Sequence, residues 1–193
     1  MTPSQLLKML KRGGVKPISS FCSYISERIA LDDISIDDYV STDNLLKDCQ
    51  GLNKYDGTPN TTSVVKFHKG DILLSNIRPY LKKIWLADRD GGCNADVLVI
   101  RVTENEVLSE YVYYNLCCSS FFDFVMSDVK GIKMPRGNKS HILKYEIPII
   151  PLSEQEKILE QVHQYEEEIR NAKDIIDNCE NRKRMILQKY LYS

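Results

Sequence analysis

The sequence predicts an α+β protein, with a mainly β domain that contains short helices and one long C-terminal coiled-coil helix. Short β-branched and aliphatic runs bounded by Gly, Asn and Asp fill the first half of the chain, a pattern typical of strands. Helical patterns follow them. The last forty residues hold a heptad pattern without an interrupting glycine or proline. Strands that precede helices, rather than alternate with them, favour α+β over a parallel α/β sheet.

Strands are expected over the apolar runs Ile18–Ile25, Val64–Phe67, Asp71–Ser75, Ile84–Leu86 and Ala95–Val102. Gly91 and Gly92 are expected in a turn and match no phosphate-binding fingerprint. At the N-terminus, Met1–Arg12 is expected to form a short helix that ends at a pair of glycines.

Two helices are expected after the last of these strands, over Glu110–Cys118 and from Ser119 or Ser120 to Met126. The phenylalanines of the second helix are expected in the core. The segment Gly131–Asn138 contains proline and glycine and is expected to be a loop, after which a short helix begins near Ser140.

The long C-terminal helix is preceded by a proline-bounded strand, Glu146–Pro151, and its start is marked by Ser153 with Glu156, which form a capping box. A helix of about 38 residues would be roughly 57 Å long at about 1.5 Å per residue. That length exceeds what a domain of this size needs for its own core, so we expect a spacer or a dimerisation arm. One face of this helix repeats with a 4-3 spacing, and we call this face the seam. Its residues are Ile158, Val162, Tyr165, Ile169, Ala172, Ile176, Cys179, Lys183, Ile186 and Tyr190. All of them except Lys183 are expected to contact the partner helix of a dimer.

Length and composition predict one globular domain plus the helix, because the chain has 193 residues and a domain usually has about 100–150. The sequence contains no apolar run of about 18 residues and no signal-peptide core. We therefore expect a cytoplasmic protein without membrane contact. Six cysteines lack a CxxC pair and zinc-ligand spacing, so we expect reduced thiols and no metal.

The charges are distributed unevenly along a chain whose net charge is −1. Residues 27–48 contain seven acids and two bases, whereas residues 130–145 contain five bases and no acid. Residues 66–89 contain six bases and two acids. Two concentrated basic segments indicate a polyanion-binding surface, and solvated loop lysines are the alternative.

The sequence contains no motif that predicts catalysis. A DNA methyltransferase needs a glycine loop for its cofactor and an Asn/Asp-Pro-Pro-aromatic run, and neither is present. The acids of residues 154–157 are explained by the start of a helix rather than by a nuclease metal site. No nucleophile elbow is present either. We therefore expect no catalytic residues and no enzyme activity.

Three polar loops are better candidates for binding, namely residues 53–62, 75–83 and 133–141. Arg and Asn side chains match the edges of guanine and adenine, whereas Lys suits phosphate oxygens. The candidate DNA contacts are Lys54, Thr58, Asn76, Arg78, Tyr80, Lys82, Lys83, Lys133, Arg136, Asn138, Lys139 and His141.

Several segments resemble the target-recognition unit of the DNA specificity subunit of type I restriction-modification systems. They are Gly70–Pro79, the strand from Cys93-Asn94-Ala95-Asp96 to Val102, Gly131 with its loop, and above all Ile147–Ile158, which is similar to the family's Pro-Leu-x-x-Glu-Gln junction. The resemblance implies an N-terminal helix or linker over residues 1–14, a DNA target-recognition domain over 15–151, and a helix for dimerisation and spacing over 152–193. Family members have two recognition domains and two long antiparallel helices, and this chain has one of each.

The resemblance further implies a non-catalytic subunit that binds double-stranded DNA and directs methyltransferase and restriction subunits to a bipartite site. The chain itself needs no cofactor, because S-adenosylmethionine is expected on the methyltransferase partner. A half-length version can act as an antiparallel dimer, either with itself or with another half specificity subunit. The alternatives are a recognition module of a fused methyltransferase-nuclease and a coiled-coil adaptor that does not bind DNA.

Overall fold

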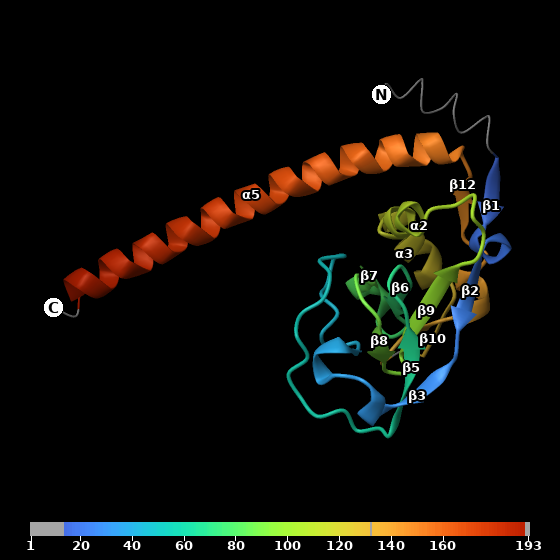
Figure 1. The fold of residues 1–193 in the computed structure, drawn as a ribbon, viewed down its shortest axis with the longest axis horizontal. Helices are drawn as coiled ribbons and strands as arrows, with labels where there is room; N and C mark the ends of the chain where they lie inside the picture. The colour runs from blue at the N-terminus through green and yellow to red at the C-terminus, as the bar shows by residue number, and fades with distance from the viewer. Residues whose placement is uncertain (1–13, 132, 192–193) are drawn as a thin grey trace. The chain divides into compact units, whose positions relative to one another are not determined.

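The computed structural model describes residues 14–131 and 133–191 and shows the predicted α+β class (Figure 1). It divides into two compact units between Leu152 and Ser153. The first unit contains the strands and the short helices, and the second is a single helix. The helix expected over residues 1–12 lies outside the described residues.

The first unit contains two four-stranded sheets and two two-stranded ones. One four-stranded sheet has the order β2 (Cys22–Ile25), β9 (Val97–Val102), β6 (Ile72–Ser75), β7 (Ile84–Leu86), with antiparallel neighbours. The other has the order β3 (Arg28–Ala30), β5 (Ser63–Phe67), β8 (Gly91–Cys93), β4 (Tyr39–Val40), in which the β4–β8 pair is parallel. The strands expected from apolar runs are therefore present, with shifted ends.

Both sheets contribute side chains to one hydrophobic core. Phe67 of β5 and Trp85 of β7 meet edge to face, with ring centroids 5.9 Å apart. Every residue of β6 is buried, which explains why its sequence is a continuous apolar run rather than an alternating one. The members of this core are Val40, Leu45, Phe67, Leu73, Trp85, Ala87, Cys93, Val97 and Val99.

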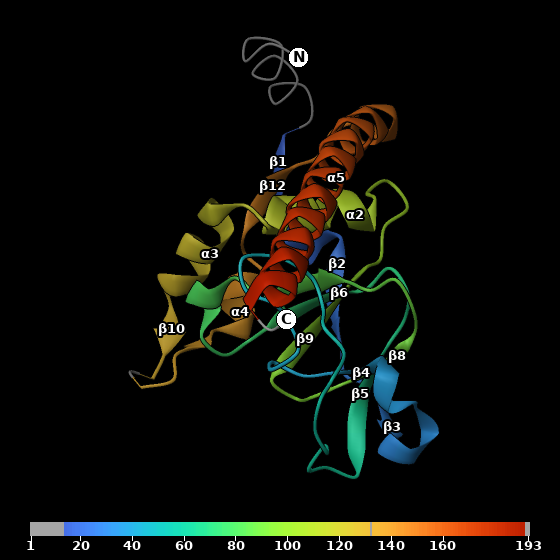
Figure 2. The ribbon, with the colours of Figure 1, turned by 90° about the vertical axis from the view of Figure 1, so that its left-hand side faces the viewer.

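Short helices connect the strands. They are the 3₁₀ turns η1 (Ile18–Ser20), η2 (Leu31–Asp33), η3 (Ile36–Asp38) and η4 (Pro79–Leu81), and the α-helices α2 (Ser109–Leu116), α3 (Ser119–Met126) and α4 (Lys139–Ile142). The expected core role of the phenylalanines of α3 is confirmed for Phe121 and Phe122, which are buried, whereas Phe124 is half-buried. Both η4 and α4 pack against α3, and Figure 2 shows α4 next to α3.

The expectation of a turn at Gly91 and Gly92 was wrong, because both residues belong to strand β8. The cause is close packing between strands. A Cβ on Gly91 would lie 2.3 Å from the Asp38 carbonyl oxygen, and one on Gly92 would lie 2.4 Å from Val64 Cγ2. Local sequence showed two glycines, whose usual place is a turn, but here Gly91 allows the backbone of Asp38 to approach and Gly92 makes room for the Val64 side chain.

The first strand expected from the sequence is shorter than predicted, because η1 occupies its start. The preceding residues instead form β1 (Val15–Pro17), which pairs antiparallel with β12 (Glu146–Pro148). This pairing joins the two ends of the first unit. Pro148 has no N–H to donate, which is tolerated because both strands of a two-stranded sheet are edge strands.

The predicted long helix is α5 (Leu152–Leu191), with 40 residues. It begins one residue before Ser153, so Ser153 lies in the first turn rather than at the expected cap position. Every residue from His163 to Leu191 is exposed. The exposed large apolar side chains of α5 include Tyr165, Ile169, Ile175, Ile176, Met185, Ile186, Leu187, Tyr190 and Leu191. None of the helices in the described ranges is long and apolar enough to span a membrane.

All six cysteines are free thiols, as expected. Cys22 and Cys93 are buried, and loss of hydration raises the pKa of each thiol to about 12. Both therefore stay protonated at neutral pH and behave as small apolar side chains in the core. In residues 14–131 and 133–191, no cluster of three or more His, Cys, Asp or Glu side chains is arranged to hold a metal ion.

Candidate nucleic-acid interface

The structure joins two of the three loops that the sequence singled out. The Arg78 N–H donates to the Pro135 carbonyl at 2.8 Å, and the Gly137 N–H donates to the Asn76 carbonyl at 3.0 Å. Ile77 also lies opposite Arg136 in an antiparallel bridge. Two basic loops that are distant in the sequence therefore run side by side. We call residues 76–83 and 133–139 together the paired-loop surface.

Arg136 lies at the centre of this arrangement. It belongs to strand β11 (Arg136–Gly137), which pairs with β10 (Val129–Lys130) and places Lys130 opposite Arg136. Ile77 is its partner on the other side. Because directly opposed residues of an antiparallel pair project from the same face, Lys130 and Arg136 are displayed together. Both are exposed.

The turn η4 is held in a strained backbone conformation. Arg78 and Lys82 flank it with φ values of 49° and 50°, in the left-handed region that non-glycine residues rarely adopt. Each such residue costs on the order of 1–3 kcal/mol and persists only where surrounding contacts impose it. Here the bond from Arg78 to Pro135 is one such contact. The contacts that impose this strain also fix the direction in which the basic turn projects.

Two lysines of the first loop are tied to neighbouring segments. Lys82 donates through Nζ to Ser119 Oγ at 3.0 Å, and the Lys83 ammonium donates to the Thr42 carbonyl. Lys83 is half-buried, and the loss of hydration lowers its pKa. These two cations therefore help to position the loop, in addition to contributing charge.

Three polar residues of the candidate set are buried or bonded within the domain, although the buried Asn76 Oδ1 accepts no hydrogen bond from the described residues. Asn76 is only 7% exposed and lies beneath Gly137, where a Cβ would come within 3.1 Å of its Oδ1. Asn138 accepts from Ser140 N–H at the start of α4 and donates to Asp128 Oδ2 at 2.9 Å. The His141 ring stacks on Phe124 with centroids 4.0 Å apart. Asn76 is thus part of the interior, and the other two stabilise the turn into α4.

The exposed part of the paired-loop surface is basic and partly aromatic. Tyr80 is 51% exposed, and the side chains of Arg78, Lys133 and Lys139 are exposed as well. Arg136 pairs with Asp96, with Nη2 at 3.0 Å from Oδ1 and 3.1 Å from Oδ2. Exposed cations beside an aromatic ring are suited to a polyanion such as the phosphate backbone of DNA.

The remaining candidates, Lys54 and Thr58, lie in the segment between β4 and β5. Thr58 is exposed. Lys54 Nζ forms an ion pair with Asp37 at 2.8 Å, and the hydrogen bond with this carboxylate raises the pKa of Lys54.

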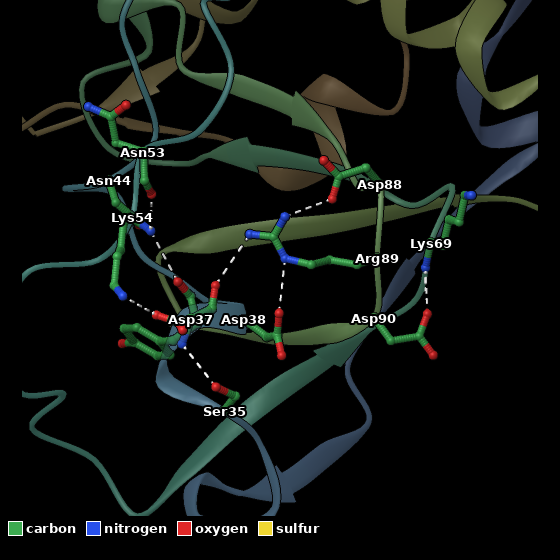
Figure 3. A network of polar contacts seen from close by, with 11 residues as sticks. Ser35, Asp37, Asp38, Asn44, Asn53, Lys54, Lys69, Asp88, Arg89 and Asp90 are labelled. Atoms are coloured by element: carbon green, nitrogen blue, oxygen red, sulfur yellow. Dashed lines mark hydrogen bonds and ion pairs between the residues drawn. The ribbon is translucent and has the colours of Figure 1, made fainter.

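Figure 3 shows that Lys54 belongs to a second polar network, centred on Arg89. Arg89 Nε lies 3.0 Å from Asp38 Oδ1, and its Nη1 lies 2.8 Å from Asp88 Oδ1. The guanidinium also lies over the Trp85 ring, 5.5 Å from its centroid. Asp37 and Asp38, from the acid-rich segment 27–48, therefore form ion pairs with Lys54 and Arg89.

Sequence reasoning missed Asp96 as a partner of the basic loops. It lies in the turn between β8 and β9, forty residues from the arginine that it contacts. Its neighbours showed a turn and a strand but no link to the basic loop. From the sequence, Lys130 was included only in the positive charge of residues 130–145. Its position opposite Arg136 follows from the β10–β11 register.

A family model described as "Type I restriction modification DNA specificity domain" matches residues 26–181. Among curated proteins, the chain is similar to the type I restriction enzyme EcoDI specificity subunit of Escherichia coli, with 27% identity over 125 residues. That match covers 61% of this chain and 28% of the relative. The chain thus spans less than a third of the length of this relative.

Solved structures show the same fold. The HsdS subunit of Thermoanaerobacter tengcongensis has a TM-score of 0.67 and 22% identity, over 91% of this chain and 47% of that one. The S subunit of a type I restriction-modification system from M. genitalium has a TM-score of 0.59 and 19% identity, over 88% and 42% of the two chains. The family match over most of the chain confirms the predicted resemblance, and the protein belongs to the family of type I restriction modification DNA specificity domains.

Proposed function

We propose that this chain is the sequence-specific DNA-binding component of a type I restriction-modification system. It directs the system's catalytic subunits to their site and has no catalytic role of its own. The single observation that supports this most strongly is the paired-loop surface of this family member. Its two basic loops are hydrogen-bonded to each other and display exposed cations. Rigid positioning of Arg and Lys is what DNA recognition requires.

The partners follow from the same proposal. The curated relative is named as the specificity subunit of a restriction enzyme, and a further solved structure of similar fold, with a TM-score of 0.67, concerns complex assembly of the type I R-M system. We infer that this chain assembles with a methyltransferase subunit, which binds S-adenosylmethionine, and with a restriction subunit. A DNA-directed role also agrees with the cytoplasmic location expected from the sequence.

The exposed face of α5 supports dimerisation. Ile169 and Ile176 occupy equivalent seam positions one heptad apart, and both are more than half exposed in the isolated chain. In an antiparallel two-fold dimer of this chain, the seam of each α5 packs against the seam of the other, and the dimer has two recognition domains. A homodimer then reads a bipartite inverted repeat, whereas a pair with a different half subunit reads an asymmetric site.

Affinity for DNA tests the proposal through its salt dependence. For each phosphate contact, the slope of log K against log salt concentration becomes more negative by about 0.9. Lys133→Ala and Lys139→Ala are each expected to make the slope shallower by about 0.9, because each removes one exposed cation. Fluorescence anisotropy with the full chain and a random-sequence duplex, between about 50 and 200 mM salt, measures the slope.

Lys66→Ala is the matched control, since Lys66 lies on β5 and faces Glu27 at 3.6 Å. It is expected to leave the slope unchanged. Salt-independent or undetectable binding by the parent chain contradicts DNA recognition and favours the adaptor function.

Deletion of residues 172–178 removes one heptad and preserves the phase of the seam. If α5 sets the distance between half-sites, the gap in the recognised site shortens by up to roughly 3 base pairs. A heptad spans about 10 Å at 1.5 Å per residue, and a base pair about 3.4 Å. Methylome sequencing of strains with the parent gene, the deletion and no gene measures the gap. An unchanged gap shows that α5 is not the spacer.

A further inference from the structure

The ion pair between Arg136 and Asp96 leaves part of the guanidinium unused. Asp96 contacts only Nη2, through both carboxylate oxygens. In the described ranges no residue forms a hydrogen bond or ion pair with Nε or Nη1. Both side chains are accessible, with 54% of the Arg136 side chain and 38% of the Asp96 side chain exposed. The arginine is therefore oriented from one side and open to a ligand from the other.

Asp96 is itself held in place by its backbone. Its N–H donates to Asn94 Oδ1 at 2.7 Å, which closes the turn between β8 and β9. Its carbonyl accepts from the Asn76 N–H at 2.8 Å, in the first loop of the paired-loop surface. The carboxylate thus projects from a turn that is bonded to the same ladder as its arginine. This arrangement reduces the conformational entropy that Arg136 would lose on binding.

An oriented guanidinium with free donors matches one base in particular. Guanine presents two acceptors in the major groove, O6 and N7, and arginine can donate to both at once. Both forks of a guanidinium include Nη2, which has two N–H donors, so the bidentate contact uses one N–H of Nη2, together with Nη1 or Nε, while the other N–H of Nη2 faces Asp96. Such a contact needs a fixed plane, whereas a phosphate accepts donors from many directions.

We propose that Arg136 reads a guanine in the major groove and that Asp96 is its positioning residue, which holds the guanidinium plane toward the base. This inference rests on the proposed DNA-binding function. It assigns base recognition to one arginine of the paired-loop surface and orientation to a carboxylate outside it.

Arg78 is the natural comparison. It is exposed on the same surface, its positive charge contributes to the lowered pKa of Lys83, and no carboxylate in the described chain pairs with its guanidinium. Without a partner that fixes its plane, Arg78 suits a phosphate. Arg78→Ala should therefore weaken binding to all sequences alike and make the salt slope shallower by about 0.9.

The experiment is selection from a pool of duplexes with a fully randomised central stretch, using the full chain and its Arg136→Lys, Asp96→Asn and Arg78→Ala variants. The parent chain is expected to select a guanine at one position of each half-site. Arg136→Lys keeps the charge but loses the fork, so preference for that guanine should fall by about 5-fold to 150-fold, with other positions unchanged. Asp96→Asn should reduce the preference at the same position by a smaller factor, without making the salt slope shallower.

Thermal unfolding of each variant, with a midpoint close to that of the parent, shows that the fold is intact. Unchanged preferences in Arg136→Lys overturn the assignment of guanine to Arg136. Equal weakening at every position in Asp96→Asn overturns the positioning role. A parent chain that binds DNA and selects bases, with variants that select the same bases, leaves the DNA-binding function standing and rejects this inference alone. Absence of any DNA binding by the parent overturns both.

Discussion

Gly91→Ala is expected to destabilise the recognition domain by about 3 kcal/mol, at the upper end of the usual cost of overpacking a core. The new Cβ would lie 2.3 Å from the Asp38 carbonyl oxygen and 2.6 Å from Phe67 Cζ. One neighbour is backbone and the other belongs to the core, so neither can move cheaply. The parallel pairing of β8 with β4 and its antiparallel pairing with β5 must therefore loosen.

The backbone of Gly91 is outside the left-handed region, so the predicted loss comes from space alone. Gly57→Ala is the matched control, because its Cβ would approach only the Tyr55 side chain, at 3.2 Å, in an exposed loop. Denaturant and thermal unfolding measure the difference. The Gly91 variant should unfold roughly 6–12 °C lower, and the control should stay within about 0.5 kcal/mol of the parent. Equal stability of the two variants would contradict the packing of β8.

Ile169→Glu combined with Ile176→Glu is expected to convert the proposed dimer into a monomer. Two charges per chain would enter an apolar seam, where unpaired carboxylates are costly. The helix itself should persist, since Glu is at least as good a helix former as Ile. Loss of the second recognition domain should weaken binding to the complete site by about 10²-fold to 10⁴-fold, the usual range for linked binding modules.

The control places the same two charges on the opposite face of α5, as Asn181→Glu with Gln188→Glu. These residues lie five positions after the seam residues Ile176 and Lys183, so the added charge repels DNA equally without entering the seam. Analytical ultracentrifugation gives the mass of each variant, and anisotropy titration on a complete site gives the affinity. A seam variant that remains dimeric, or a control that also dissociates, refutes the dimer seam inferred from the heptad pattern.

Local patterns in the sequence were sufficient for most of the elements. The apolar run Ile72–Leu74 and the β-branched run of β9 predicted strands because both are buried on two faces. The long helix could be predicted because heptad spacing and the absence of glycine and proline are properties of neighbouring residues. Its expected range began at Leu152, as in the structure, but Ser153, the expected cap, lies inside the first turn, because neighbouring residues differ little as cap positions.

The candidate site was predictable in its composition but not in its assembly. Basic residues in two loops indicated a polyanion surface, and the structure brought those loops together through Ile77 and Arg136. Residue type alone made Asn76 and Arg136 equally good candidates for DNA contacts. Packing separated them, because Gly137 covers the amide while the guanidinium remains exposed.

The sequence by itself therefore determined the order of strands and helices, the long amphipathic arm, the basic loops and the family resemblance, since each depends on residues close together in the chain. Only the tertiary structure decided that β8 is a strand, that Lys54 pairs with Asp37, and that Asp96 pairs with Arg136. These outcomes depend on contacts between residues from seventeen to more than fifty positions apart, and no local periodicity encodes such contacts.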